Sequence, residues 1–187
     1  MTIAEAQQEI RAAYLGGFAG QLVSGLLWLG SAALASWGPA RWAILLLVAG
    51  GFFIFPATLL TLRLIGHRVR ASRANPLNAL AMQVAFVLPL SLPLVFAAAL
   101  HKLNWFYPAF MIVLGAHYLP FTFLYGMRMF IALCGALVGA GVLVGLYGSD
   151  AFSPGAWITG GILLLFAAIG RIQVGKELAS GPTSGES

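Results

Sequence analysis

Residues 115–128 read GAHYLPFTFLYGMR and lie in an apolar run that begins near Trp105. The run is long enough to cross a bilayer, whose hydrocarbon core requires about 20 apolar residues in a helix. The stretch nevertheless carries an imidazole, a proline and several hydroxyl groups, and polar groups are costly in hydrocarbon. It therefore predicts a membrane-spanning helix that contains a polar site.

The composition of the whole chain indicates the same class. Of its 187 residues, 60% are hydrophobic and only 8% are charged, which is too few ionisable groups to cover a water-facing globule. The acidic residues all lie outside the apolar runs. They are Glu5, Glu9, Asp150, Glu177 and Glu186. We expect an all-α integral membrane protein whose main partner is the lipid bilayer.

Six apolar runs meet or nearly meet the length needed for a transmembrane helix. The chain is therefore expected to form a bundle of six transmembrane helices. The expected spans are residues 13–36, 42–62, 77–100, 105–126, 128–148 and 154–174.

The basic residues predict the orientation of this bundle. With the amino terminus in the cytoplasm, only Arg41 and Lys102 lie on the outer side, and the other eight Lys and Arg lie on the inner side. This is the bias of the positive-inside rule. Tryptophan and tyrosine side chains also gather at the expected outer ends, as an aromatic belt does. Both termini are expected in the cytoplasm.

The two ends of the chain fall outside the spans. Thr2 and Glu5 have the spacing of a capping box, in which each side chain satisfies a backbone N–H at a helix start. Residues 1–12 are expected to form an amphipathic interfacial helix that leads into the first span. Residues 175–187 end in a polar, turn-rich stretch, and a disordered cytoplasmic tail is expected there.

Small residues recur at helical spacing in two spans. Such faces let helix backbones approach closely in lipid. We expect them to pack within the chain, and a homo-oligomer contact is the alternative. The residues are Gly16 and Gly20 in the first span and Gly135, Gly139, Gly141 and Gly145 in the fifth.

Polar side chains of the first four spans fall in the inner half of the bilayer. Counted from the inner ends of their spans, Gln21 lies about 12 Å deep and His117 about 13 Å deep. We predict a pocket there that opens toward the cytoplasm. Its expected lining is His117, Gln83, Gln21, Thr58, Thr122 and Tyr125. Arg63 and Arg128 lie at its inner rim, where we interpret them as topology anchors rather than as anion ligands.

Each of these polar residues also has a purely structural interpretation. His117 can donate a hydrogen bond to a carbonyl that Pro120 frees, and Gln21 and Gln83 can join neighbouring helices. The functional interpretation makes His117 a ligand contact or a proton acceptor, because it is the only group within a span that titrates near neutral pH. Both interpretations stay open.

A metal site is not expected. His67, His101 and His117 fall at three different depths, the single Cys134 has no partner cysteine, and no carboxylate lies in a span. We therefore expect no metal, no cofactor and no catalytic residue. The basic residues form no continuous face, which argues against nucleic acid as a partner.

Three short stretches of the sequence resemble a protein family. They are residues 115–128, Asn75-Pro76-Leu77, and Glu5-Ala6-Gln7 with the following Tyr14-Leu15-Gly16-Gly17. Up to about residue 128 the chain resembles a family of small uncharacterised bacterial multi-span proteins. The resemblance implies six helices and a bacterial inner membrane, and it brings no activity.

Three functions remain open. The preferred one is a protein that binds or transports a small solute through the predicted pocket. The alternative is a structural or partner-binding membrane protein with no ligand, whose polar groups only hold helices together. The third is an enzyme that modifies a lipid or quinone with His117 as base, which requires an opening toward acyl chains beside that residue.

Overall fold

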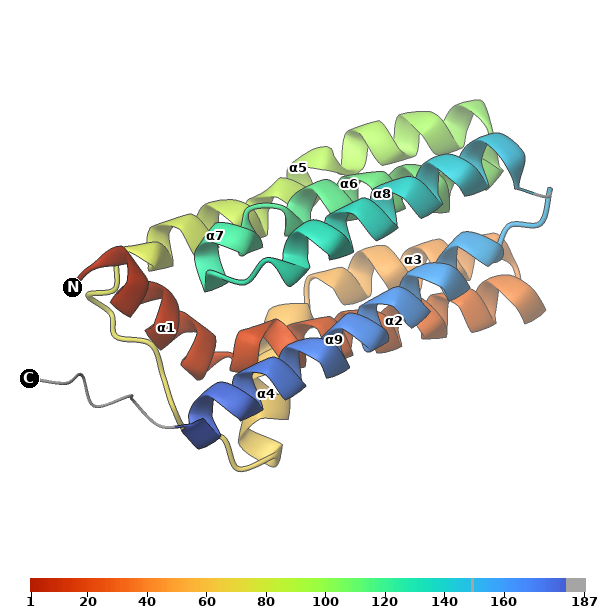
Figure 1. The fold of residues 1–187 in the computed structure, drawn as a ribbon. Coiled ribbons are helices and arrows are strands. Elements are labelled where there is room, and N and C mark those ends of the chain that lie inside the picture. The colour runs from red at the N-terminus through yellow and green to blue at the C-terminus, as the bar shows by residue number, and fades with distance from the viewer. Residues whose placement is uncertain (149, 181–187) are drawn as a thin grey trace, which may run out of the picture.

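The computed structural model describes residues 1–148 and 150–180, and every regular element in these ranges is a helix (Figure 1). The elements are α1 (Ile3–Ala13), the 3-10 turn η1 (Leu15–Gly17), α2 (Phe18–Trp37), α3 (Ala40–Gly51), α4 (Ile54–Leu64), α5 (Leu77–His101), the 3-10 turn η2 (Leu103–Trp105), α6 (Phe106–Tyr118), α7 (Phe121–Tyr125), α8 (Met129–Tyr147) and α9 (Pro154–Ser180).

The all-helical fold of a multi-pass membrane protein is confirmed. Among the described residues, five helical segments are long and apolar enough to cross a membrane, and α3 with α4 makes a sixth when this pair counts as one span. The five are Leu15–Trp37, Leu77–His101, Leu103–Tyr125, Met129–Tyr147 and Pro154–Glu177. Each overlaps one of the expected spans.

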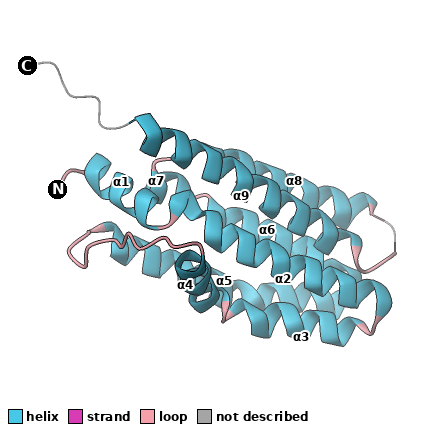
Figure 2. Cartoon of the chain, turned by 90° about the horizontal axis from the view of Figure 1, so that it is seen from below, coloured by secondary structure: helices cyan, strands magenta, loops and turns pink. Residues whose placement is uncertain are grey.

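The segment expected as the second span, residues 42–62, is broken into two helices. α3 and α4 meet at an angle of 67°, and Figure 2 shows α4 turned across the direction of its neighbours. Pro56 cannot donate to the carbonyl of Phe52 and its ring crowds that carbonyl, so a straight helix cannot pass through this point. In the observed structure Pro56 lies in the first turn of α4, where its missing N–H costs nothing.

The capping box at the amino terminus is confirmed. The Glu5 N–H donates to Thr2 Oγ1 at 3.2 Å, and the Thr2 N–H donates to Glu5 Oε2 at 2.7 Å. α1 does not run on into the first span, however. Leu15, Gly16 and Gly17 have φ angles of 50°, 63° and 83°, and this left-handed turn ends the helix. The regular α-helix of the first span, α2, therefore begins at Phe18, after the turn η1, whereas the span was expected from residue 13.

The left-handed turn makes Gly16 sensitive to substitution. A Cβ there would lie 2.8 Å from Val174 Cγ2, whereas a Cβ on Gly66, at φ 76°, would meet nothing within 4 Å. Alanine at either site incurs a left-handed penalty of about 1 to 2 kcal/mol, and only Gly16→Ala adds a steric clash. We expect Gly16→Ala to lower the melting temperature in detergent clearly more than Gly66→Ala. Equal losses would contradict the contact with Val174.

The fourth and last spans differ in detail from expectation. The fourth span consists of η2, α6 and α7, because Pro120 interrupts the helix, and Gly126 ends it at φ 64°. α9 continues to Ser180, so residues 175–180 are helical although a disordered tail was expected from residue 175. The remainder of that tail, residues 181–187, lies outside the described residues.

Most of the small residues pack within the chain. A Cβ on Gly141 would lie 2.9 Å from the carbonyl oxygen of Pro108, and a Cβ on Gly20 would lie 3.6 Å from Thr58 Oγ1. Gly16 and Gly145 also have neighbours from other elements. In contrast, a Cβ on Gly135 or Gly139 would meet nothing within 4 Å, so this face of α8 is open. A homo-oligomer through that face stays a prediction.

Candidate functional site

Stacked rings fill the region around the 115–128 stretch. His117 and Tyr118 come from α6, Phe121 and Tyr125 from α7, and Phe130 from α8; these five residues are the inner aromatic cluster. The ring centroids of His117 and Phe121 are 5.1 Å apart, and those of Tyr125 and Phe130 are 5.4 Å apart. Pro120 separates α6 from α7, because it cannot donate to the carbonyl of Ala116.

His117 is buried within this cluster. Only 9% of the residue is exposed, and its ring interacts with the backbone of Val84 on α5. Its Nδ1 atom is buried and has no hydrogen-bond partner. The imidazole therefore joins α6 to α5 and still offers one ring nitrogen for a further hydrogen bond.

Gln21 on α2 has a buried carboxamide without hydrogen bonds. It is 2% exposed, and neither its Oε1 nor its Nε2 has a hydrogen-bond partner. Ser24 lies on the same face of α2, one turn further along, and Gly17 is the left-handed residue that immediately precedes the helix. A Cβ on Gly17 would lie 3.4 Å from the Phe130 ring, and Ser24 interacts with Tyr118. The face of α2 that carries Gln21 therefore looks toward the inner aromatic cluster.

The other expected lining residues fall into two groups. Thr122 on α7 has a buried Oγ1 without a partner, and Tyr125 is part of the inner aromatic cluster. Thr58 is buried on α4, but its hydroxyl already donates to the Ile54 carbonyl at 2.7 Å. Gln83 is exposed on the surface of α5. The rings of His117 and Tyr125 thus both contact Phe121 within the inner aromatic cluster, Thr122 follows Phe121 on α7, and Gln83 lies outside.

The two arginines assigned to the inner rim are exposed. Arg63 lies in the last turn of α4, and Arg128 precedes α8. Neither has an ion-pair partner among the residues that the structure describes. Their positions at the ends of apolar helices suit interfacial anchoring.

α1 makes a layer of contacts, not expected from the sequence, at the end of the bundle that carries the inner aromatic cluster. Gln7 Nε2 donates to the Phe123 carbonyl at 2.6 Å, and Arg11 Nη1 donates to the Tyr125 carbonyl at 2.8 Å. Arg11 Nε also lies 2.9 Å from Glu177 Oε2 on α9. α1 thus lies against α7, directly over the inner aromatic cluster. The spacing of Gln7 and Arg11 by one helical turn was the available signal.

The histidines do not come together, and no three His, Cys, Asp or Glu side chains of the described residues gather around one point. His67 Nε2 lies 2.9 Å from the Ala12 carbonyl, and His101 is exposed beside Trp105. Two hollows of the described surface lie away from His117. One is an apolar groove along α3, and the other is a small space of about 70 Å³ between α1 and α9.

The site offers hydrogen bonds without charge. A carboxamide can donate and accept, an imidazole nitrogen and a hydroxyl can each do one or the other, and the surrounding rings supply flat apolar walls. The described spans hold no carboxylate at this depth. The arrangement suits binding through neutral hydrogen-bonding groups.

Comparisons with known proteins agree with an uncharacterised membrane family. Neither the curated proteins nor the solved structures contain a match to the chain. One family model, described as "Family of unknown function (DUF7010)", matches residues 3–173, which include α1 and nearly all of the helical bundle. Because this match covers most of the sequence, the chain belongs to the DUF7010 family of unknown function.

Proposed function

We propose that this protein binds a small uncharged solute between α2, α6 and α7, and that it spans the bacterial inner membrane six times with both termini in the cytoplasm. The broken pair α3 and α4 counts as one span in this topology. The orientation is supported by the two basic residues at one end of the bundle and the eight at the other. Carrier activity would follow if the bound solute is released on both sides.

The unpaired carboxamide of Gln21 is the observation that carries this proposal. A buried polar group without a hydrogen-bond partner lowers the free energy of unfolding by about 1 to 3 kcal/mol, and native proteins rarely contain such a group. Gln21 leaves two such atoms on α2, and His117 Nδ1 on α6 and Thr122 Oγ1 on α7 add two more. A solute with its own donor and acceptor would satisfy several of them at once.

The charge of the solute follows from its surroundings. A buried ion without a counter-ion is strongly unfavourable in a low-dielectric site. Arg11 lies against α7 beside the inner aromatic cluster, but Glu177 and the Tyr125 carbonyl engage its guanidinium. A neutral molecule with a flat apolar body suits the rings of Tyr118 and Phe121 best.

Gln21→Leu tests this function directly. Leucine removes the unpaired amide at similar volume, so the empty protein should become more stable by about 1 to 3 kcal/mol. The same change should weaken solute binding about tenfold or more, the equivalent of one lost hydrogen bond of about 1.4 kcal/mol. Mass spectrometry of small molecules that co-purify with the protein, together with its melting temperature, measures both effects.

Gln83→Leu is the matched control, because Gln83 is exposed on α5. It should change neither the co-purifying molecule nor the melting temperature.

The second candidate function is a structural membrane protein, and the stacking of Tyr125 on Phe130 favours it. A wild-type protein that carries no small molecule, with Gln21→Leu simply more stable, would establish the structural role and overturn solute binding.

A further inference from the structure

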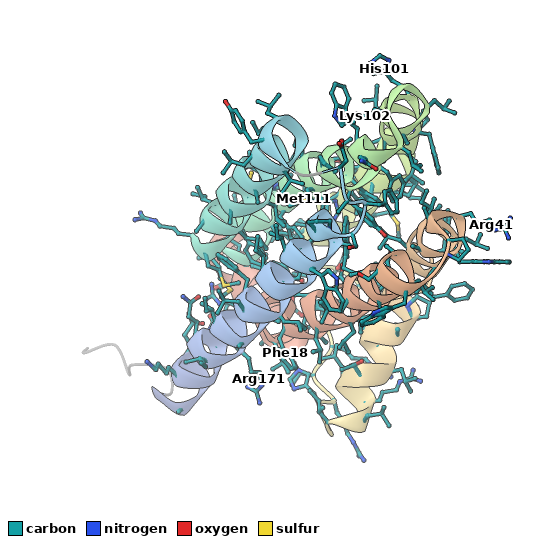
Figure 3. All side chains as sticks on the ribbon, turned by 90° about the vertical axis from the view of Figure 1, so that its right-hand side faces the viewer. Phe18, Arg41, His101, Lys102, Met111 and Arg171 are labelled. Atoms are coloured by element: carbon teal, nitrogen blue, oxygen red, sulfur yellow. The ribbon has the colours of Figure 1, made fainter. Side chains whose placement is uncertain are left out.

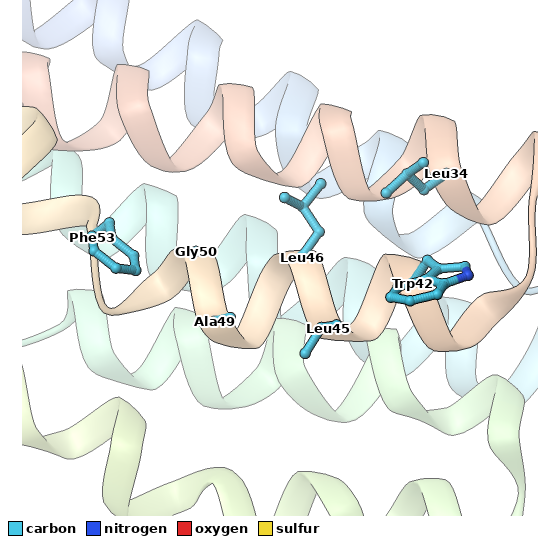
Figure 4. Close-up of a pocket in the computed structure, with 7 residues that line it drawn as sticks. All are labelled: Leu34, Trp42, Leu45, Leu46, Ala49, Gly50 and Phe53. Atoms are coloured by element: carbon cyan, nitrogen blue, oxygen red, sulfur yellow. The ribbon is translucent and has the colours of Figure 1, made fainter.

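A shallow apolar groove runs along α3, away from the Gln21 site. It encloses about 540 Å³ and is lined by Leu34 of α2 and by residues of α3 and the following bend (Figure 4). The further lining residues are Trp42, Leu45, Leu46, Ala49, Gly50 and Phe53. All of these are apolar.

One end of the groove carries a cation that lacks a counter-charge. Arg41 lies next to Trp42, and its guanidinium carbon is 5.6 Å from the centre of the Trp42 ring. Figure 3 looks onto this end of the bundle and shows Arg41 and Lys102 on different helices. Lys102 pairs with Asp150 at 3.5 Å, whereas Arg41 has no acidic partner among the described residues. Arg41 is therefore free to bind an anionic group.

The other end of the groove is marked by Phe53. Phe53 lies at the bend where α4 turns away by 67°. From Trp42 to Phe53 the helical rise gives a groove about 16 Å long. Half of a bilayer core is about 15 Å thick, so the groove has the depth of one leaflet.

We propose that this groove holds one acyl chain of a phospholipid from the outer leaflet, with the lipid phosphate bound to Arg41. The apolar lining accepts the chain, the bend at Phe53 ends it, and the guanidinium pairs with the phosphate. The lipid is thereby distinguished from those that merely surround the protein. This inference is independent of the solute site at Gln21.

Native mass spectrometry of the purified full chain tests the proposal. Delipidated protein in dodecyl maltoside is titrated with dioleoyl phosphatidylglycerol, and the first bound equivalent is compared between variants. We expect wild type to bind one equivalent at least about tenfold more tightly than the following ones. Ala49→Trp fills the groove and should abolish this first equivalent, and Arg41→Gln should weaken it about tenfold, as loss of one charge-assisted hydrogen bond does.

Ala97→Trp is the matched control, because Ala97 is also exposed on a helix but lies on α5. It should bind like wild type, and all variants should elute as monodisperse protein. Equal binding by Ala49→Trp and Ala97→Trp would overturn the proposal, and so would a wild-type protein whose first lipid is no tighter than the next. A dimer that Ala49→Trp dissociates would also overturn it, because a second copy would then occupy the groove.

Discussion

Gly160→Leu is expected to prevent α2 and α9 from packing. It should lower the free energy of unfolding by more than about 3 kcal/mol, which is at or above the largest typical loss for an overpacked core. These two helices form the most extensive pair in the described part of the bundle. A Cβ on Gly160 would lie 2.5 Å from Leu29 Cδ2 and 3.2 Å from the Gly25 carbonyl oxygen. The backbone of Gly25 cannot withdraw without moving α2. The yield of monodisperse protein and its melting temperature in detergent measure the loss.

The neighbouring Gly161 provides the control for this prediction. It lies in the same helix, but a Cβ there would meet nothing within 4 Å. Gly161→Leu adds an apolar side chain to an exposed face and raises helix propensity, so we expect a neutral or slightly stabilising effect. If both leucine variants lose stability equally, the close approach of α2 and α9 at Gly160 is contradicted.

Local rules predicted much of this fold. The capping box of Thr2 and Glu5 depends only on neighbouring residues, and the apolar runs depend only on the thickness of the bilayer. Both features were therefore readable from the sequence. The break before α4 was predictable only in part. Pro56 disfavours a regular helix at this point, but the 67° angle depends on how α3 and α4 pack on α2.

The candidate site was harder to predict for a geometric reason. Counting residues from a helix end gives depth, but it does not give rotation about the helix axis. Gln83 and Gln21 were placed at similar depths, and yet Gln83 faces outward while Gln21 is 2% exposed. α5 is apolar on nearly all sides, so its sequence contains no polar stripe that fixes its rotation.

The position of α1 depends on contacts between residues far apart in the sequence. Its apolar side chains Ala6, Ile10 and Ala13 were expected at the membrane interface, and the structure buries them against the protein. Arg11 meets Tyr125 and Glu177, which lie more than a hundred residues away. An amphipathic pattern shows that a helix has an apolar face, but lipid and protein can both cover such a face.

Asn75→Ala should release α1 from the bundle and lower the free energy of unfolding by about 2 to 4 kcal/mol. Asn75 is 3% exposed, and its Nδ2 donates to the Ala6 carbonyl at 3.0 Å and to Glu9 Oε2 at 2.6 Å. Its Oδ1 accepts from the Leu77 N–H at 2.9 Å at the start of α5. Alanine removes these three hydrogen bonds, two of them buried and the one to Glu9 part-buried, at about 1 kcal/mol each. Faster hydrogen exchange of the α1 amides and a lower melting temperature are the expected readouts.

Asn78→Ala, in the first turn of α5, is the control for the loss of an asparagine side chain in this region. The Asn78 side chain donates to the Ser72 carbonyl at 2.8 Å and makes only one further, longer bond, to the Arg73 carbonyl at 3.5 Å. Both bonds are exposed, so its loss should cost less than about 1 kcal/mol and leave exchange in α1 unchanged. Because α1 covers the inner aromatic cluster, Asn75→Ala should also speed exchange in α7, where Gln7 and Arg11 dock. Faster exchange in α1 without any change in α7 would show that α1 does not hold this end of the bundle closed.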